Sequence, residues 1–303
     1  MRVIITGGTG LIGTPLAAGL AFDGVEVVVL SRDPERHPDL PRGVRAEKWD
    51  ARTATGWSHL ADGADAIVNL AGESLAGGPW TEERKSRILH SRLNAGRAVL
   101  QAVESAAQKP RVVVQASAIG YYGPKGDEEV TEETPPGSDF LARVCVEWEA
   151  STSPVEEMGV RRAVIRSGIV LSTRGGALPR LMMPYRLFVG GPLGSGRQWY
   201  SWIHIADEVA AIRFLLENES ARGPFNLTAP NPVTNALFSR LLGRALGRPS
   251  RVRTPAFALW LLLGEMATTV LNGQRVIPRR LQSLGFAFRF PHLEAALRDL
   301  FQV

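Results

Sequence analysis

The fold is decided at Thr6-Gly7-Gly8-Thr9-Gly10-Leu11-Ile12-Gly13, where a β-branched run ends and a helical pattern begins. Residues without side chains let the backbone turn tightly and approach a pyrophosphate, whose charge is favoured at a helix N-terminus. A glycine turn alone could be strand-to-helix punctuation, but Val3–Thr6 and Leu11–Phe22 supply the required strand–turn–helix context. We therefore expect a dinucleotide to contact Gly7, Thr9, Gly10, Leu11, Ile12 and Gly13.

Outward from this turn, short apolar runs alternate with longer helical patterns. Because Val, Ile, Leu and Ala dominate them, buried strands are predicted at Val3–Thr6, Val25–Leu30, Ala66–Leu70, Val112–Ser117 and Ala163–Val170. Helices are predicted between them, at 11–22, 81–108 and 139–158, and later at 206–217, 236–246, 257–271 and 292–301. This alternation predicts an α/β fold, a Rossmann doubly wound parallel sheet. Residues 1–172 would form the nucleotide-binding domain and 173–303 a smaller, mostly helical substrate lobe, with about 200–230 returning to the sheet.

The charge of the chain is unevenly distributed. Residues 151–303 carry 19 arginines and no lysine against nine acidic residues, whereas the first 150 residues carry 16 basic and 21 acidic residues. Either a bias against lysine or a C-terminal half shaped for an anionic ligand explains this distribution. The whole chain has four lysines, and none follows Lys125.

The composition excludes several kinds of site. Cys145 is the single cysteine, so the chain has no internal disulfide and no multi-cysteine metal site. The five histidines show no paired ligand spacing, and we expect no metal. No secretory signal opens the sequence, and the apolar stretch 255–271 falls short of the roughly 20 residues that a membrane span needs. We expect a cytoplasmic protein without a membrane segment, in which 255–271 is a buried helix or covers a partner surface.

The residues after the second predicted strand bear on the choice of cofactor. An NAD site would place an acidic residue there for the ribose 2′-hydroxyl, but this chain has Ser31-Arg32. A hydroxyl and a guanidinium suit a 2′-phosphate and favour NADP(H); alternatively Arg32 is a surface residue that pairs with Asp33. Asp50 could accept from the adenine amino group or simply form a turn. Along the ribose and phosphates we expect Leu70, Ala71 and Gly72.

Four motifs together resemble a known superfamily: Gly7–Gly13, Asn69–Gly72, Ser117–Gly123 and Ile203–Asp207. On these motifs the chain resembles the extended short-chain dehydrogenase/reductases, which include nucleotide-sugar epimerases and dehydratases. It is similar more narrowly to their poorly characterised, NADP-dependent "epimerase family" subgroup, on Asn69–Glu73, Ser91–Leu93, Trp148–Ala150, Arg166–Leu171, Gly190–Gly196, Trp202–Asp207 and Gly273–Pro278. The resemblance spans essentially the whole chain.

The resemblance implies a catalytic pair that this chain lacks. The superfamily uses Tyr-x-x-x-Lys on a helix, where positions i and i+4 share a face. Glu149 matches the family's glutamate beyond the lysine, and counting back from it places Cys145 at the lysine and Leu141 at the tyrosine. The run Tyr121–Lys125 spells the same pattern, but it contains Gly123-Pro124, a turn signature, and proline inside a helix costs about 3 kcal/mol.

The resemblance leaves Ser117, Tyr121 and Tyr122 as candidates near the nicotinamide, with Ala118 as an alternative to Ser117 at the serine position. A tyrosine could exchange a proton near neutral pH if a neighbouring cation lowered its pKa; alternatively the two rings only wall the pocket. Arg92 and Glu149 could reach the ribose or nicotinamide end of the cofactor, or could pair with each other.

These features lead to two hypotheses of function. The first is an NADP(H)-dependent oxidoreductase or epimerase-like enzyme acting on a small polar, anionic substrate, held by the arginines at 174, 180, 186, 197 and 275 and by the aromatic run 198–202. His204 could be an acid or base there, or could tie the loop to the next helix. The alternative is a non-catalytic NADP(H)-binding regulator or redox sensor, suggested by Leu141 and Cys145.

Nucleic-acid binding is not expected, because the arginines scatter through loops and helices without a recognised motif. The sequence leaves open the identity of the substrate, the direction of the reaction, turnover without the usual pair, and the oligomeric state, for which a homodimer is one option.

Overall fold

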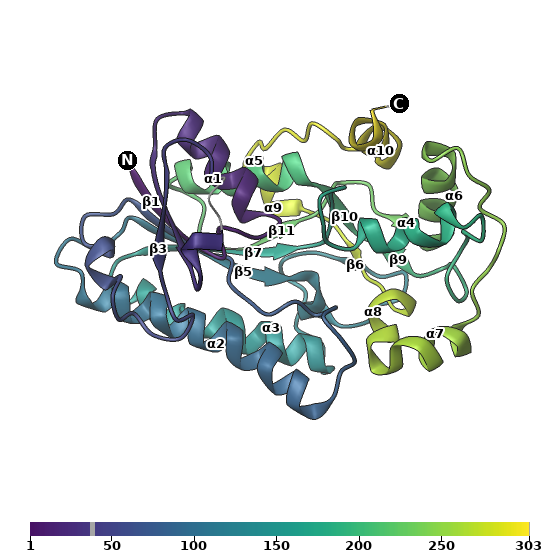
Figure 1. Cartoon of the computed structure of the whole chain (residues 1–303), viewed down its shortest axis with the longest axis horizontal. Coiled ribbons are helices and arrows are strands. Elements are labelled where there is room, and N and C mark those ends of the chain that lie inside the picture. The colour runs from purple at the N-terminus through teal and green to yellow at the C-terminus, as the bar shows by residue number, and fades with distance from the viewer. Residues whose placement is uncertain (37–39, 303) are drawn as a thin grey trace.

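A seven-stranded parallel sheet forms the centre of the molecule, seen in a computed structural model that describes residues 1–36 and 40–302 (Figure 1). The strand order is β11-β7-β5-β4-β1-β2-β3, so the direction of winding reverses between β1 and β4. In open α/β sheets, ligands bind outside the carboxyl ends of the strands at such a reversal. The strands are β1 (Arg2–Thr6), β2 (Glu26–Ser31), β3 (Val44–Lys48), β4 (Ala66–Asn69), β5 (Val112–Ala118), β7 (Arg161–Ser167) and β11 (Gly223–Leu227).

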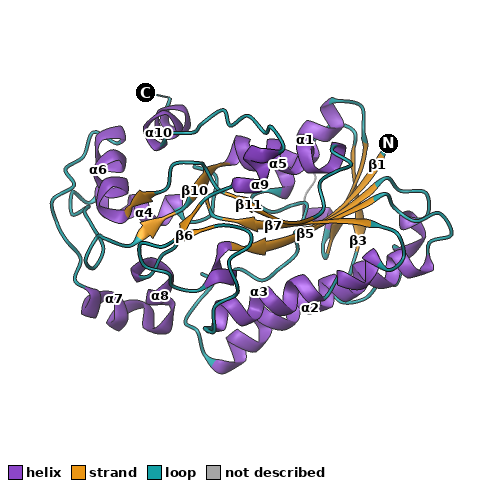
Figure 2. Ribbon diagram, turned by 180° about the vertical axis from the view of Figure 1, so that it is seen from behind, coloured by secondary structure: helices purple, strands orange, loops and turns teal. Residues whose placement is uncertain are grey.

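Helices cover both faces of this sheet (Figures 1 and 2). On one face lie α1 (Gly13–Phe22) and α5 (Ile205–Glu217), and on the other lie α2 (Glu82–Ser105) and α3 (Phe140–Ala150). The side chains of β1 alternate between these layers, since Val3 and Ile5 pack in the α1–α5 core while Ile4 packs in the α2 core. Burial on both faces explains the continuous apolar runs and confirms the predicted doubly wound α/β fold.

The C-terminal part adds a mostly helical lobe beyond the carboxyl ends of the strands (Figure 1). Two pairings connect it to the sheet region: β10 (Trp202–His204) with β8 (Ile169–Leu171), and β13 (Arg275–Val276) with β6 (Glu129–Val130). A third, β12 (Val233–Thr234) with β9 (Trp199–Tyr200), lies within the C-terminal part. Its helices are α4 (Leu178–Arg186), α6 (Asn235–Ala245), α7 (Ala256–Leu263), α8 (Thr268–Leu271) and α10 (Leu293–Phe301), while the short α9 (Arg279–Ser283) contacts β11. A separate apolar core holds α4, α6 and α10 together.

Three predicted elements are interrupted in the structure. The strand expected at 163–170 ends at Ser167, and residues 169–171 pair with β10 instead. Between the two strands the backbone passes so close to Ser201 that a Cβ on Gly168 would lie 2.5 Å from its carbonyl oxygen. The helix expected at 139–158 ends at Ala150 and is followed by a short 3₁₀ turn. The helix expected at 257–271 breaks at Gly264, whose φ of +57° is not helical.

The apolar stretch 255–271 also differs from expectation in its burial. Phe257, Leu261 and Leu262 on α7 are largely exposed, so α7 is not a buried helix. Within the described residues, no helix is both long and apolar enough to cross a membrane.

Candidate functional site

The glycine turn packs against the end of β4 with no room for side chains. Gly7 has a φ of +66°, and a Cβ there would lie 2.9 Å from the carbonyl carbon of Leu70. A Cβ on Gly13 would lie 2.5 Å from the Cα of Gly8, so the start of α1 closes directly onto the turn. No side chain caps the N-terminus of α1. Its first-turn N–H groups therefore suit a phosphate.

The segment after β4 lies beside this turn. The Thr6 hydroxyl accepts from the backbone N–H groups of Leu70 and Ala71, at 3.1 and 3.2 Å. A Cβ on Gly72 would lie 3.1 Å from the guanidinium carbon of Arg92. The turn, the 70–72 segment and Arg92 therefore follow one another along the carboxyl edge of the sheet.

At the end of β2, Ser31 is buried and Arg32 is exposed. Asp33 pairs with Arg36 at 2.7 Å, so the alternative of an Asp33–Arg32 pair is not observed. No hydrogen bond or ion pair engages the Arg32 guanidinium within residues 1–36 and 40–302. Arg32 is therefore available to a ligand at the place where the 2′-phosphate is expected.

Asp50 organises its own turn. Its carboxylate accepts from the backbone N–H groups of Arg52 and Thr53, at 2.7 and 2.8 Å, and from the Thr53 hydroxyl at 2.9 Å. Slight burial raises the pKa of Asp50, but these bonds outweigh it and hold the pKa below its ordinary value. Hydrogen bonds within this turn engage both carboxylate oxygens of Asp50. A contact between Asp50 and the adenine stays a prediction.

Behind the edge, a buried set of side chains surrounds Arg166; we call it the Arg166 network. The guanidinium donates to both oxygens of Glu149, at 2.8 and 2.9 Å, and to the Tyr122 hydroxyl at 3.0 Å. The Ser117 hydroxyl donates to Glu149 at 2.6 Å, and the Tyr122 hydroxyl donates to Asn226 at 2.6 Å. These bonds account for both donor and acceptor sides of the tyrosine hydroxyl.

The geometry of the network bears on the roles expected of its members. Burial raises the pKa of Tyr122 to about 12 even though Arg166 opposes the shift, and the ring is fully buried. Tyr121 stacks on Arg166, with the guanidinium carbon 3.4 Å from the ring centroid. Neither tyrosine, nor Ser117 or Glu149, lines the cavity described next. The geometry therefore supports a structural role for Tyr122, rather than proton transfer, and for Glu149, rather than cofactor contact.

A cavity of about 220 Å³ lies in front of this network, at the carboxyl ends of β5 and β7; we call it the Arg92 cavity. Leu141 and Cys145, the positions that the resemblance assigns to the missing pair, both line it. Burial raises the pKa of the Cys145 thiol to about 11. Tyr121 belongs to a 3₁₀ turn, residues 119–122, that ends at Gly123 (φ +64°), so Tyr121 and Lys125 share no helical face, as predicted.

Arg92 is the cation of this cavity. Its guanidinium donates to the backbone carbonyls of Glu73 and Ile88, at 3.1 and 2.9 Å, and lies 4.9 Å from the ring centroid of Trp148. No carboxylate of the described residues forms an ion pair with it, and the considered Arg92–Glu149 pair is not formed. Burial lowers the pKa of Arg92.

Two further residues of the site were missed by sequence reasoning. Ser167 lines the Arg92 cavity, and its hydroxyl bonds to Glu208 at 2.5 Å. Glu208, on α5, is fully buried, and burial raises its pKa to about 8. Its second oxygen has no hydrogen-bond partner among the described residues. Ser167 ends β7 directly beside Ala118 at the end of β5. A serine at the end of the strand next to the expected serine position was the signal that could have pointed to Ser167.

His204 has a structural position. Its Nδ1 accepts from the backbone N–H of Ala206, which caps α5, and its Nε2 lies 3.4 Å from the Asp299 carboxylate. Burial lowers the pKa of His204. The ring therefore ties the loop to the helix, the second of the two roles considered for it. No group of three His, Cys, Asp or Glu side chains in the described part of the chain could hold a metal ion.

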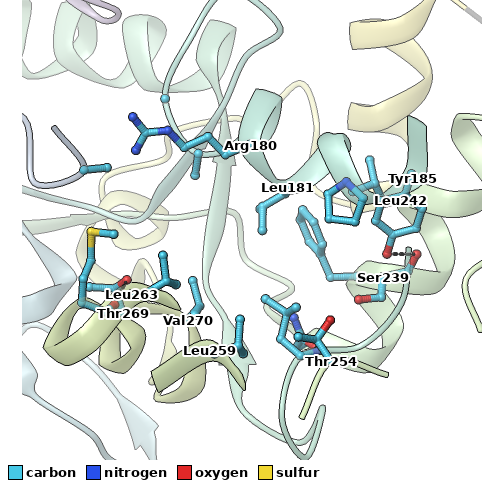
Figure 3. A pocket seen from close by; sticks show the side chains of 18 of the residues that line it. Arg180, Leu181, Tyr185, Ser239, Leu242, Thr254, Leu259, Leu263, Thr269 and Val270 are labelled. Atoms are coloured by element: carbon cyan, nitrogen blue, oxygen red, sulfur yellow. Dashed lines mark hydrogen bonds between the residues drawn. The ribbon is translucent and has the colours of Figure 1, made fainter. Parts of the chain in front are cut away.

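A second, larger cavity of about 590 Å³ lies in the helical lobe; we call it the lobe cavity (Figure 3). It shares Leu75 and Thr269 with the Arg92 cavity, so the two adjoin. Of the five arginines expected around a substrate, only Arg180 lines either cavity. Arg275 instead lies over Trp199, with its guanidinium carbon 5.3 Å from the ring centroid.

Comparison with known proteins agrees with this geometry. The model of the NAD dependent epimerase/dehydratase family matches residues 3–228, and that of a domain of unknown function, DUF1731, matches residues 254–300. Epimerase family proteins of Staphylococcus aureus (strain N315) and Staphylococcus epidermidis (strain ATCC 35984) are 40% identical over 302 residues and 39% identical over 303 residues. Each alignment covers 99% of this chain and 98% of the relative.

Two solved structures extend the comparison. The human epimerase family protein SDR39U1 (isoform 2), crystallised with NADPH, is similar with a TM-score of 0.90 and 36% identity, covering 100% of this chain and 99% of that chain. A nucleoside-diphosphate sugar epimerase from Corynebacterium glutamicum has a TM-score of 0.79 and 36% identity, covering 99% of this chain and 58% of that one. The chain therefore belongs to the NAD dependent epimerase/dehydratase family, within the extended short-chain dehydrogenase/reductases.

Proposed function

We propose that the chain is an NADP(H)-dependent oxidoreductase or epimerase-like enzyme whose reaction takes place in the Arg92 cavity. The observation that carries this proposal is the buried Arg92 guanidinium, which lines the cavity without a carboxylate partner among the described residues. Buried charges in proteins are usually paired, so an unpaired cation indicates a place for an electronegative ligand group. Arg92 thus supplies from α2 a positive charge that the missing lysine would have supplied from α3.

The residues along the sheet edge suit the cofactor. The glycine turn and the uncapped start of α1 would hold the pyrophosphate, and Ser31 and Arg32 would hold the 2′-phosphate. The NADPH in the human relative's structure supports NADP(H). The nicotinamide supplies or accepts the hydride when it is bound.

Ser167 and Glu208 would hold the proton that the usual tyrosine holds. Glu208, with a pKa of about 8, keeps its proton at neutral pH. When a substrate carbonyl is reduced, the Ser167 hydroxyl gives its proton to the substrate oxygen and takes the carboxylic proton of Glu208, which becomes a carboxylate. In the oxidative direction the same protons move back.

The cofactor assignment is tested by Arg32→Ala, with Arg45→Ala, an exposed arginine on β3, as the matched control. Loss of a charge-assisted contact to the 2′-phosphate should weaken NADPH binding by about 10- to 100-fold and leave NADH binding nearly unchanged. Arg45→Ala should change neither affinity. Titration calorimetry measures both, and equal losses of NADPH and NADH affinity in Arg32→Ala would refute the assignment.

The second candidate function is a regulator that binds NADP(H) without turnover, which the absence of a Tyr-x-x-x-Lys pair favours. A redox sensor acting through Cys145 is less well supported, because a buried thiol with a pKa of about 11 is a poor nucleophile at neutral pH. The near-ultraviolet absorbance of bound NADPH separates the candidates after a panel of carbonyl compounds is added. Loss of absorbance supports the enzyme, whereas retained absorbance with every compound supports the regulator.

A further inference from the structure

The lobe cavity has apolar walls. It lies between α4, α6 and α7, and the side chains that face it include Leu181, Leu242, Leu259, Leu263 and Val270 (Figure 3). Phe238 also lines it. Arg180 is the one charged residue among the described residues that line it. Its volume of about 590 Å³ is within the range of cavities that enclose small-molecule ligands.

Several of the polar groups in these walls are bonded to the protein itself. The Tyr185 hydroxyl donates to the carbonyl of Ser239 at 3.0 Å, and the Ser239 hydroxyl donates to the carbonyl of Gly191 at 3.3 Å. The Asn235 side-chain oxygen accepts from the backbone N–H of Leu193 at 2.8 Å. A sugar hydroxyl placed against these largely apolar walls would lose its water and find few free partners among the described residues, such as the hydroxyls of Ser74 and Thr254, which opposes binding of a sugar nucleotide here.

The charged end of the cavity is also the end nearer to the proposed reaction. Figure 3 shows Arg180 and Thr269 on one side of the cavity and Tyr185 and Leu242 on the other. Thr269 and Leu75 are the residues shared with the Arg92 cavity. Arg180 is exposed, and its guanidinium forms no ion pair or hydrogen bond within the described part of the chain.

We propose that the ligand of the lobe cavity, and hence the substrate of this enzyme, is an anionic amphiphile. A long alkyl chain or fused hydrocarbon ring system occupies the apolar end between α4 and α6, a carboxylate or phosphate group lies near Arg180, and the oxygen-bearing carbon faces the Arg92 cavity. The identification of this ligand as the substrate rests on the proposed function. It narrows the expected small anionic substrate to one with a large apolar part.

Straight-chain carboxylates test the proposal. Carboxylates of about six to about fourteen carbons, below their micelle-forming concentrations, are titrated into the protein saturated with NADPH, and heats of binding are measured. Each added methylene should tighten binding about three- to fourfold until the apolar end is full. UDP-glucose should not compete. Affinity that is independent of chain length, or competition by UDP-glucose, would overturn the proposal.

A matched pair on α7 locates the binding. Leu263 lines the cavity, whereas Leu262, its neighbour, is 80% exposed and does not. Leu263→Trp should occupy the cavity and weaken binding of the longest carboxylates at least about tenfold, and Leu262→Trp should leave it unchanged. Unchanged NADPH affinity shows that each variant is folded. Equal effects of the two substitutions would place the ligand elsewhere and overturn the proposal.

A second pair on α4 tests the anionic group. Arg180→Ala should weaken carboxylates about two- to fivefold, a modest effect because the side chain is exposed, and should not change the affinity for 1-alkanols of equal length. Arg186→Ala, on the same helix but outside the cavity, should change neither. If Arg180→Ala weakened the binding of carboxylates and alkanols equally, the anionic group would not lie near Arg180, and this part of the proposal would be overturned.

Failure of this inference is distinguishable from failure of the proposed function. Chain-length-dependent binding by a protein that binds no NADPH would refute the enzyme and support the apolar ligand site alone. NADPH binding that is sensitive to Arg32→Ala, together with carboxylate binding that is indifferent to chain length, would overturn the inference and leave the proposed function standing.

Discussion

Arg166 and Arg92 are both buried cations near the carboxyl edge of the sheet, yet their surroundings differ. Arg166 has two bonds to one carboxylate, a third to a tyrosine hydroxyl and an aromatic ring against its face. Arg92 has two backbone carbonyls, an aromatic ring and no carboxylate among the described residues. Burial lowers the pKa of both, but the bonds to Glu149 and Tyr122 reverse this for Arg166 and raise its pKa above the ordinary value.

The difference indicates a structural role for Arg166 and a ligand-binding role for Arg92. A buried ion pair whose hydrogen bonds are complete has nothing left to offer a ligand, so the Arg166 network stabilises the ends of β5 and β7. A buried cation with incomplete partners, beside a cavity, retains free charge for a ligand. Five expected outcomes, from the largest effect to the smallest, test this division and the role of Glu208.

Arg166→Met should have the largest effect on stability. It leaves Glu149 buried without its cation and the Tyr122 hydroxyl without a donor, and breaking a buried ion pair in this way costs about 3–5 kcal/mol. Denaturant unfolding measures the loss. Arg143→Met, on the exposed face of α3, is the control and should cost less than about 0.5 kcal/mol. A loss below about 1 kcal/mol for Arg166→Met would show that the network does not hold the fold.

The raised pKa of Glu208 predicts that the free energy of unfolding depends on pH. Its ordinary pKa of 4.5 applies to the unfolded chain, whereas the folded pKa is about 8, so between these values the folded state keeps a proton that the unfolded state has released. Stability relative to Glu208→Gln should therefore fall as the pH rises from about 4.5 to about 8, by up to about 1.4 kcal/mol per pH unit, and then level off.

The raised pKa of Glu208 also predicts how the rate of carbonyl reduction depends on pH. Carbonyl reduction by the wild type should decline above about pH 8, as Glu208 loses its proton, and Glu208→Gln should lose most of the rate together with that decline. Denaturation curves and single-turnover rates across this pH range measure the two effects. A rate profile unchanged by the substitution would remove Glu208 from the proton path.

Arg92→Met should have the opposite signature to Arg166→Met. Removing an unpaired buried cation relieves its desolvation, so the free energy of unfolding should change by less than about 1 kcal/mol. Turnover should fall about 10- to 100-fold, and Arg92→Lys, which keeps a positive charge, should recover part of it. Large destabilisation with unimpaired turnover would reverse the assignment of the two arginines.

Tyr122→Phe has the smallest expected effect on turnover. It leaves the Asn226 side-chain oxygen without its tyrosine donor and removes the nearest acceptor of Arg166 Nη1, which should cost about 1–3 kcal/mol of stability while turnover changes less than about twofold. Tyr121→Phe, whose hydroxyl has no partner among the described residues, should cost less. A large loss of turnover in Tyr122→Phe at unchanged stability would restore the tyrosine as a proton donor.

Much of the edge that suits the cofactor was predictable, because it depends on local conformation. Gly7, Gly8 and Gly13 are required by a turn within eight residues, and Ser31-Arg32 follows a strand whose length the apolar pattern indicates. The reaction cavity was less predictable. Ser117 and Tyr122 were named as catalytic candidates, yet Arg166, Glu149 and Asn226 engage their hydroxyls from distant parts of the chain.

The sequence by itself determined the doubly wound sheet, the family resemblance, the glycine turn and the lack of any lysine after position 125. These features depend on residue type and on spacing along the chain. Only the tertiary structure decided that Glu149 pairs with Arg166 rather than Arg92, that Ser167 meets Glu208, and that α4, α6 and α7 enclose an apolar cavity. Ion pairs and cavity walls bring together residues that are far apart in the sequence. The sequence contains several acidic residues that could pair with each arginine, so only the packing of the folded chain determines which pairs form.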